Sequence, residues 1–187
     1  MGIILRPMEG NILPPPNEVI VLDTSVIIEI WGTSKNKKKF NKKLCRDFLI
    51  KTAVAGNILC ITTKTFEELS IIAESNIVPG DKSIFNLNKP LYLGQANSTT
   101  NSMISSLNNL PNFYPEPIGR VDGETVKTIQ ANQITHGLKW GDATIYTLTK
   151  QEGINNICSL DGDWLDVQDS NMTLYTTQYR INKYNNK

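Results

Sequence analysis

The stretch Glu18-Val19-Ile20-Val21-Leu22-Asp23-Thr24-Ser25 decides how this chain is expected to fold. Its first part is a short, apolar and β-branched run, which is typical of a buried strand. The run stops abruptly at three polar residues of the type that caps helices, so the pattern predicts a helix beginning near Val26. Asp23 therefore stands at the end of the first core strand.

Further along the chain, helical and strand patterns alternate. Apolar spacing predicts helices over residues 40–56, 63–75, 122–137 and 141–153, and short apolar runs predict strands over residues 58–61, 156–160 and 172–176. Strands separated by helices favour an α/β fold with a central, mainly parallel sheet. In open sheets of this kind ligands bind beyond the carboxyl ends of the strands, so Asp23 lies where a site is expected.

Two stretches depart from this alternating pattern in a chain whose 187 residues favour one domain. Residues 1–17 hold Pro7 and the run Pro14-Pro15-Pro16, which predict an extended, polyproline-like arm ahead of an α/β domain over residues 18–187. Residues 76–119 are rich in Asn and Ser and are interrupted by five prolines. We expect an insertion there, with one helix near residues 99–109.

The composition excludes several classes of partner and site. The 19 Lys and Arg residues nearly balance the 18 Asp and Glu residues. Any binding of nucleic acid must therefore depend on local basic patches. The three cysteines lie far apart in sequence, which disfavours a disulfide framework and a structural zinc site. The sequence shows neither a signal-peptide pattern nor an apolar run of about 18 residues, so we expect a cytoplasmic protein with no membrane partner.

His136 is the only histidine in the chain, which excludes nucleases that use two histidines of one chain as acid and base. Gly137 follows it directly, and a basic residue before glycine is typical of a helix end. A structural or surface role is the expected one, although a Ser-His-Asp triad stays formally open. The chemistry must then depend mainly on carboxylates.

Acidic side chains occur where the expected sheet places its site. Asp23 and the turn Asp161-Gly162-Asp163 each follow a strand directly, so parallel alignment would bring both to one edge. A helical projection at about 100° per residue places Glu68 beside a buried stripe and Glu67 nearly opposite that stripe. Asp142 falls in the first turn of its helix and borders apolar surface.

Each acid by itself has an ordinary explanation. Asp23 and Asp142 could serve helix N-termini. Asp161-Gly162 is a common turn dipeptide, and Glu68 alone is a typical helix-surface residue. Together they would repel one another unless a cation neutralised them, and their hard oxygens suit Mg²⁺ or Mn²⁺ rather than zinc. Such an ion activates water and stabilises charge on a phosphodiester, so we expect metal-dependent phosphodiester hydrolysis.

At these acids the sequence resembles the PIN-domain nucleases, in particular the VapC-like toxins of bacterial and archaeal toxin–antitoxin pairs. The stretches that carry the resemblance follow the family's order within residues 19–176: Val21-Leu22-Asp23-Thr24-Ser25, Thr65-Phe66-Glu67-Glu68-Leu69, Gly141-Asp142-Ala143-Thr144-Ile145 and Ser159-Leu160-Asp161-Gly162-Asp163-Trp164. Ser159 and Trp164 stand where the family usually has Thr and Phe, so hydroxyl and aromatic character are retained.

The resemblance implies a Rossmann-like α/β/α sandwich, PIN-like in type, that binds one or two Mg²⁺ or Mn²⁺ ions. By the same resemblance the metal ligands, direct or through water, are Asp23, Glu68, Asp142, Asp161 and, as a fifth, Asp163. Thr24 or Ser159 would orient a ligand or a water molecule. The implied reaction is endonucleolytic hydrolysis of RNA, carried by the first four acids and leaving a 5′-phosphate. A toxin of this kind would be covered by an antitoxin protein and would commonly form a homodimer.

Outside the acids, two features could contact RNA. The basic run within residues 35–43 could guide a phosphate backbone toward the metals, or could equally be a solvated loop. Tyr114, Trp140 and Tyr146 could stack on bases, although core packing is the expected role for most aromatic residues.

Two alternative functions compete with the nuclease. A phosphatase of the haloacid-dehalogenase type would need a second Asp where Ser25 stands, which makes that reading weak. A catalytically silent PIN-like scaffold that binds RNA or protein would require the acids to be incomplete or to lack metal. The apparent completeness of the acid set favours the enzyme.

Overall fold

The computed structural model describes residues 2–10, 13–31 and 39–186. At its centre lies a five-stranded sheet in the order β1-β5-β4-β2-β3, in which every neighbouring pair is parallel. The strands are β1 (Ile4–Pro7), β2 (Val19–Leu22), β3 (Ile58–Cys60), β4 (Asn156–Cys158) and β5 (Thr173–Thr176). The predicted α/β fold with a mainly parallel sheet is confirmed.

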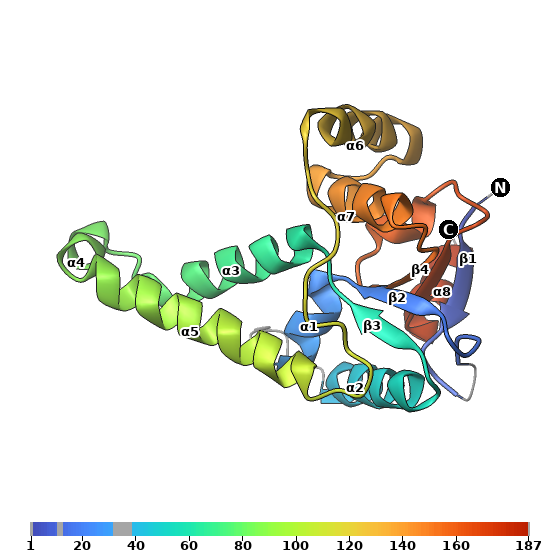
Figure 1. Ribbon diagram of the computed structural model, residues 1–187, viewed down its shortest axis with the longest axis horizontal. Coiled ribbons are helices and arrows are strands. Elements are labelled where there is room, and N and C mark those ends of the chain that lie inside the picture. The colour runs from blue at the N-terminus through green and yellow to red at the C-terminus, as the bar shows by residue number, and fades with distance from the viewer. Residues whose placement is uncertain (1, 11–12, 32–38, 187) are drawn as a thin grey trace.

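Helices connect the strands and cover both faces of the sheet (Figure 1). They are α1 (Thr24–Trp31), α2 (Lys39–Val54), α3 (Thr63–Ile77), α4 (Lys82–Leu87), α5 (Lys89–Asn108), α6 (Gly123–His136), α7 (Trp140–Gln151), the short 3₁₀ helix η1 (Asp163–Asp166) and α8 (Gln178–Asn185). Helices α1 and α2 pack on one face and α6 and α7 on the other, which gives three layers. Within the described part of the chain, no helix has the length and apolar character needed to cross a bilayer.

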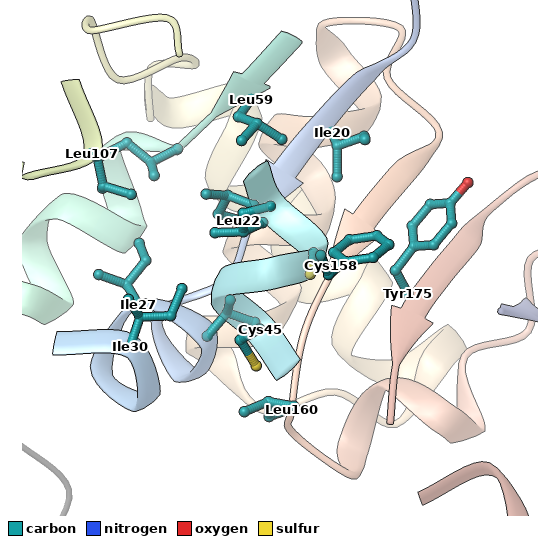
Figure 2. Packing of buried hydrophobic residues seen from close by; sticks show 14 of the residues in the cluster. Ile20, Leu22, Ile27, Ile30, Cys45, Leu59, Leu107, Cys158, Leu160 and Tyr175 are labelled. Carbon is teal, nitrogen blue, oxygen red and sulfur yellow. The ribbon is translucent and has the colours of Figure 1, made fainter. Parts of the chain in front are cut away.

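Successive residues of each strand point to opposite faces, so the sheet separates two hydrophobic cores. Ile20 and Leu22 of β2 pack with residues of α1, α2 and α5 in the core that Figure 2 shows. Val21, between them, belongs to the second core with residues of α6 and α7. Strand β4 repeats this alternation, with Cys158 in the first core and Ile157 in the second. Both strands are thereby fixed on two faces, which determines where the residues after them emerge.

Strand β1 adds part of the N-terminal stretch to one edge of the sheet. The sequence predicts only an extended arm over residues 1–17, whereas in the structure Ile4 pairs with Thr173 and Leu5 pairs with Leu174. An edge position tolerates Pro7 because proline cannot donate a hydrogen bond to a ladder and is confined to strand ends, bulges and edge strands.

The middle of the chain is more helical than the sequence predicts. The expectation of one helix near residues 99–109 is wrong in extent, because α5 spans Lys89–Asn108 and α4 precedes it. Pro90 lies in the first turn of α5, where a missing N–H leaves no helical hydrogen bond unmade, so it begins the helix instead of breaking it. Helices α3 and α5 pack along each other and project from the sheet, with α4 at the tip (Figure 1).

Candidate active site

Asp23 lies directly after β2, at the carboxyl edge of the sheet. It is only 4% exposed, and its Oδ2 accepts hydrogen bonds from the hydroxyl groups of Ser25 at 2.5 Å and Ser159 at 2.7 Å. Burial raises the pKa of Asp23, the two hydroxyl groups lower it, and the negative charge of Asp161 raises it. The orientation of this carboxylate is therefore set by one residue in the first turn of α1 and one residue directly after β4.

Ser25 and Ser159 link the first turn of α1 to the segment that follows β4. The hydroxyl oxygen of Ser25 lies 3.3 Å from that of Ser159 and accepts a hydrogen bond from the backbone N–H of Leu160 at 2.9 Å. The hydroxyl oxygen of Ser159 accepts one from the backbone N–H of Asp161, also at 2.9 Å. Because β2 and β4 are parallel neighbours, this network brings Asp161 to the same edge as Asp23, as the sequence predicts.

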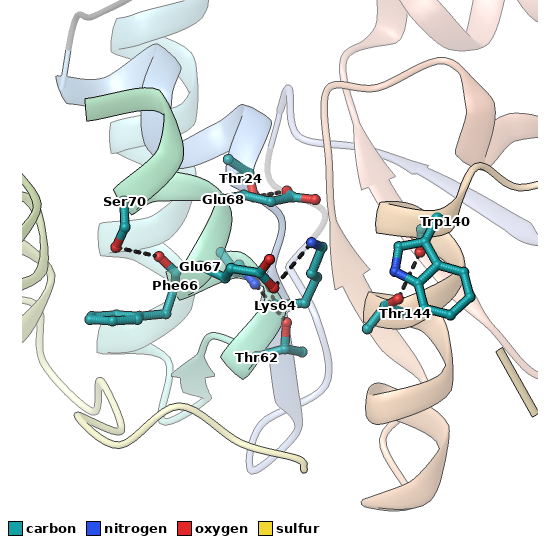
Figure 3. A network of polar contacts seen from close by, with 10 residues as sticks. Thr24, Thr62, Lys64, Phe66, Glu67, Glu68, Ser70, Trp140 and Thr144 are labelled. Atoms are coloured by element: carbon teal, nitrogen blue, oxygen red, sulfur yellow. Dashed lines mark hydrogen bonds and ion pairs between the residues drawn. The ribbon is translucent and has the colours of Figure 1, made fainter. Parts of the chain in front are cut away.

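Glu68 approaches the same edge from α3. The hydroxyl group of Thr24 donates to its Oε2 at 2.6 Å (Figure 3). Burial raises the pKa of Glu68, the hydrogen bond from Thr24 lowers it, and the charge of Asp23 raises it. Glu67 points away and forms an ion pair with Lys64 at 3.1 Å. The helical projection that placed Glu68 inward and Glu67 outward agrees with the structure.

Gly141 allows Glu68 to lie against the first turn of α7. A Cβ atom built at residue 141 would lie 2.5 Å from Oε1 of Glu68, which is closer than two such atoms approach without bonding. The missing side chain therefore lets the Glu68 carboxylate reach the turn that carries Asp142.

Asp142 interacts with every other candidate acid. It lies in the first turn of α7 and is partly buried. Its pKa is raised to about 7, first by burial and then, in decreasing order, by the negative charges of Asp23, Asp161, Asp163 and Glu68. Carboxylates that follow two strands and lie on two helices are thus close enough to influence one another's charge. We call these five residues, Asp23, Glu68, Asp142, Asp161 and Asp163, the acid cluster.

Asp163 occupies the outer side of the acid cluster, at the start of η1. Its backbone N–H donates to Oδ1 of Asp161 at 3.1 Å, and its own Oδ2 pairs with the ammonium group of Lys139 at 2.7 Å. Lys139 directly precedes α7. Asp163 therefore has a cationic partner of its own, which partly neutralises it.

The family model of the PIN domain matches residues 20–169, a span that contains the whole acid cluster. This chain belongs to the PIN-domain family. Nucleases of that family generally use divalent metal ions, and the α/β fold with its parallel sheet agrees with the PIN fold. No curated protein matches the chain.

The acid cluster of this PIN domain fits a divalent cation in its chemistry. Among the residues that the structure describes, no three His, Cys, Asp or Glu side chains are arranged closely enough to hold a metal ion. The carboxylate oxygens gathered here are, however, the hard ligands that Mg²⁺ and Mn²⁺ take. The repulsion that contributes to the raised pKa of Asp142 is what a cation between the carboxylates would relieve.

Two residues that shape this PIN-domain site were missed as site residues in the sequence. Ser25 orients Asp23 and links the first turn of α1 to the segment after β4. The feature that could have predicted this role is a hydroxyl group two residues after a strand-end acid. Lys139 pairs with Asp163, and its signal was a cation three residues before Asp142. Thr24 and Ser159, which the sequence suggested as orienting residues, bond to Glu68 and Asp23 in the structure.

The sequence predicts a helix-end position for His136 and core packing for most aromatic residues, and the structure agrees with only part of this. His136 ends α6, and Gly137 after it has a left-handed φ of 68°, so the predicted helix end is confirmed. The His136 ring packs against Tyr146, with ring centroids 4.7 Å apart, and Tyr146 belongs to the second core. Trp140 and Tyr114 are 42% and 47% exposed. The expected core packing is therefore wrong for these two residues.

The basic run lies only partly within the part of the chain that the structure describes. The side chains of residues 35–39 lie outside the described part of the chain. Lys42 and Lys43 lie on α2 and are exposed. A role of this run in guiding RNA stays a prediction.

Proposed function

We propose that this PIN-domain protein is a Mg²⁺- or Mn²⁺-dependent endoribonuclease that hydrolyses RNA phosphodiester bonds. The observation that carries the proposal is that five carboxylates lie near one another at the carboxyl edge of the sheet, where the charges of the other four add to burial in raising the pKa of Asp142. Like charges held together at this position weaken the metal-free protein, and such an arrangement makes physical sense when a cation completes it.

In this proposal the metal is held, directly or through water, by Asp23, Glu68, Asp142 and Asp161. A divalent ion bound there would activate a water molecule and stabilise the charge that develops on the phosphate. Ser25 and Ser159 keep Asp23 in place, and Thr24 keeps Glu68 in place, because each hydroxyl group donates to a carboxylate oxygen. Asp163, already paired with Lys139, serves as an outer ligand.

We further propose that the enzyme is the toxin of a toxin–antitoxin pair, that an antitoxin protein covers the acid cluster, and that the toxin forms a homodimer. The likeness of the four ordered motifs to those of VapC-like toxins supports this role. Expression of the chain should arrest growth, and co-expression of the product of an adjacent small reading frame should relieve the arrest. Growth arrest that persists in an Asp23→Asn variant would contradict a toxic effect based on RNA cleavage.

Cleavage of a labelled RNA with and without Mn²⁺ tests the nuclease proposal. We expect wild-type protein to cut RNA only with Mg²⁺ or Mn²⁺ and to lose activity in excess chelator. Asp23→Asn keeps the size of the side chain but removes a charged ligand, so cleavage should fall by about 10³-fold or more. Asp47→Asn, an exposed acid of α2, is the matched control and should cleave normally.

Circular dichroism of both variants distinguishes lost chemistry from lost fold. Unchanged cleavage by Asp23→Asn, or cleavage that persists in excess chelator, would contradict the proposal of a metal-dependent nuclease. A wild-type protein that binds RNA but does not cut it with any divalent ion would instead support a catalytically silent RNA-binding scaffold.

A further inference from the structure

A hollow lies beside the α3 and α7 turns that carry Glu68 and Asp142. It has a volume of about 320 Å³, near the lower end of the range of about 300–1,000 Å³ for small-ligand pockets. Its lining comes from the start of α3, the segment before α6 and the start of α7, and consists of Thr63, Lys64, Glu67, Arg120, Val121, Trp140 and Thr144. We call it the Trp140 pocket.

Trp140 gives this pocket an aromatic wall. It is 42% exposed although it is the first residue of a helix that is otherwise largely buried. Its backbone carbonyl accepts a hydrogen bond from the Thr144 hydroxyl at 2.7 Å (Figure 3), and its side chain lines the hollow together with Lys64 and Glu67 of α3. A large aromatic face left partly in solvent at the edge of a hollow is suited to stack on a planar ring.

Lys64 and Arg120 give the same pocket its cations. The side chain of Lys64 is only 13% exposed, and its Cε would lie 3.9 Å from a Cβ atom built at residue 141. The ammonium group of Lys64 therefore stands between the pocket and the acid cluster, where its charge lowers the pKa of Glu68. Glu67 pairs with Lys64 but is 58% exposed, so the pairing is screened by solvent and open to competition from another anion.

We propose that the Trp140 pocket binds one nucleotide of an RNA chain next to the bond that the acid cluster cuts. Trp140 stacks on the base, and Lys64 and Arg120 hold the phosphate of that nucleotide. The proposal rests on the proposed endoribonuclease function. It explains a feature that the acid cluster does not need, namely an aromatic face and two cations beside the Glu68–Gly141 contact.

The tryptophan fluorescence of the chain offers a direct test. Trp164 is fully buried and Trp31 is half-buried, so stacking on Trp140 should account for most quenching by a short oligoribonucleotide. The titration uses the full chain carrying Asp23→Asn, so that the RNA stays intact. Binding is measured in parallel by the anisotropy of a dye-labelled copy of the same RNA.

Two substitutions of Trp140 separate stacking from a general loss of structure. In the Asp23→Asn background, Trp140→Phe should abolish the quenching but keep the anisotropy affinity within about threefold, because Phe still stacks. Trp140→Ala should weaken binding by about 5- to 150-fold, the value of one stacked base. Tyr179→Ala, which removes an exposed aromatic residue of α8 outside the pocket, should bind as the parent does.

The cations are tested by the dependence of binding on salt. Arg120→Gln should weaken binding at low salt and reduce the slope of log affinity against log salt by about one, as expected when one phosphate contact is lost. Lys127→Gln, an exposed cation of α6 outside the pocket, should leave the slope unchanged.

The outcomes distinguish this inference from the proposed function. If the wild type cuts RNA with Mn²⁺ but Trp140→Ala and Arg120→Gln bind and cut as the wild type does, the pocket inference is wrong and the nuclease stands. If Trp140→Ala and Trp140→Phe weaken binding equally, stacking is also ruled out. If the wild type cuts no RNA with any divalent ion, the proposed function fails first, and the pocket inference fails with it.

Discussion

The acid cluster and the Trp140 pocket share two helices and differ in almost every physical property. In the acid cluster, Asp23 is buried and Glu68 is half-buried, and hydroxyl groups fix the carboxylates of both. In the pocket, Trp140 and Glu67 are exposed and face a shallow hollow. Burial favours fixed geometry and altered pKa values, whereas exposure favours contacts that form and break with a ligand.

The two regions are separated by single turns of α3 and α7. Glu68 and Asp142 face the acid cluster, while Lys64 and Trp140 face the pocket. Gly141 lies between them, where only a hydrogen atom fits beside Glu68. Substitutions in the acid cluster should therefore change the rate of RNA cleavage, and substitutions in the Trp140 pocket should change RNA affinity.

Asp142→Asn should have the largest effect and should move activity and stability in opposite directions. Loss of a metal ligand should lower RNA cleavage with Mn²⁺ by about 10³-fold. Because the folded pKa of Asp142 is raised to about 7, well above that of the unfolded chain, ionisation destabilises the metal-free fold as pH rises toward 7. The variant should therefore be more stable in chelator near pH 8, by about 1–2 kcal/mol after allowance for partial exposure.

Urea unfolding in chelator measures this stability difference, and repetition near pH 4 serves as the control. Because pH 4 is close to the ordinary aspartate pKa of 3.8, the folded wild type is protonated at residue 142 and the unfolded chain is partly protonated there, so most of the difference should vanish. A variant that is less stable than wild type at pH 8 would mean that Asp142 forms favourable contacts that outweigh the repulsion.

Gly141→Ala should lower cleavage without loss of stability. The added Cβ would stand 2.5 Å from Oε1 of Glu68, so the flexible carboxylate must move, and displacement of a catalytic group by about 1 Å can cost up to about 100-fold in rate. We expect cleavage about 10- to 100-fold slower and an unchanged or slightly higher melting temperature, since Ala favours helix over Gly. Gly94→Ala in α5, whose Cβ would meet nothing within 4 Å, is the matched control and should cut RNA normally.

The affinity for Mn²⁺ should depend on pH through Asp142. A ligand carboxylate must lose its proton before it binds metal. With the pKa of Asp142 at about 7, affinity should rise by about tenfold for each pH unit below 7 and level off above it. Calorimetric titration with Mn²⁺ across this range measures the slope. In Asp142→Asn the slope should flatten, and an equally steep slope in that variant would assign the titration to another group.

The sequence predicts those parts of the fold that depend on local patterns. Strands β2 and β4 are buried on both faces, so they require continuous apolar runs, and α3 has one buried stripe that orients Glu68. Strand β1 was not predicted, because Arg6 and Pro7 are ordinary in an arm and become a strand only through pairing with the distant β5. Helix α5 was underestimated because its Asn and Ser residues have low helix propensity and Pro90 resembles a helix breaker.

The candidate site shows the same division. The sequence predicts that Asp23 and Asp161 emerge at one edge, because that follows from parallel strands. It does not predict that Ser25 reaches Leu160 or that Trp140 is exposed, because both depend on how loops and helices far apart in the chain pack together. The local sequence pattern therefore pointed to the acids. The tertiary structure was needed to show which hydroxyl groups hold them in place and that a pocket lies beside them.

Glu67→Gln should have the smallest effect and the opposite sign to the other substitutions. Two cations and one carboxylate line the Trp140 pocket, and Glu67 draws Lys64 into an ion pair at 3.1 Å. Removing that negative charge frees the ammonium group and ends the repulsion of RNA phosphate, so affinity should increase by about two- to fivefold at low salt and return to the parent value at high salt. Anisotropy titrations in the Asp23→Asn background measure this change. Glu74→Gln, an exposed acid of the same helix outside the pocket, controls for net charge and should have less effect. Weaker RNA binding by Glu67→Gln would mean that Glu67 positions Lys64 for the phosphate and does not compete with it.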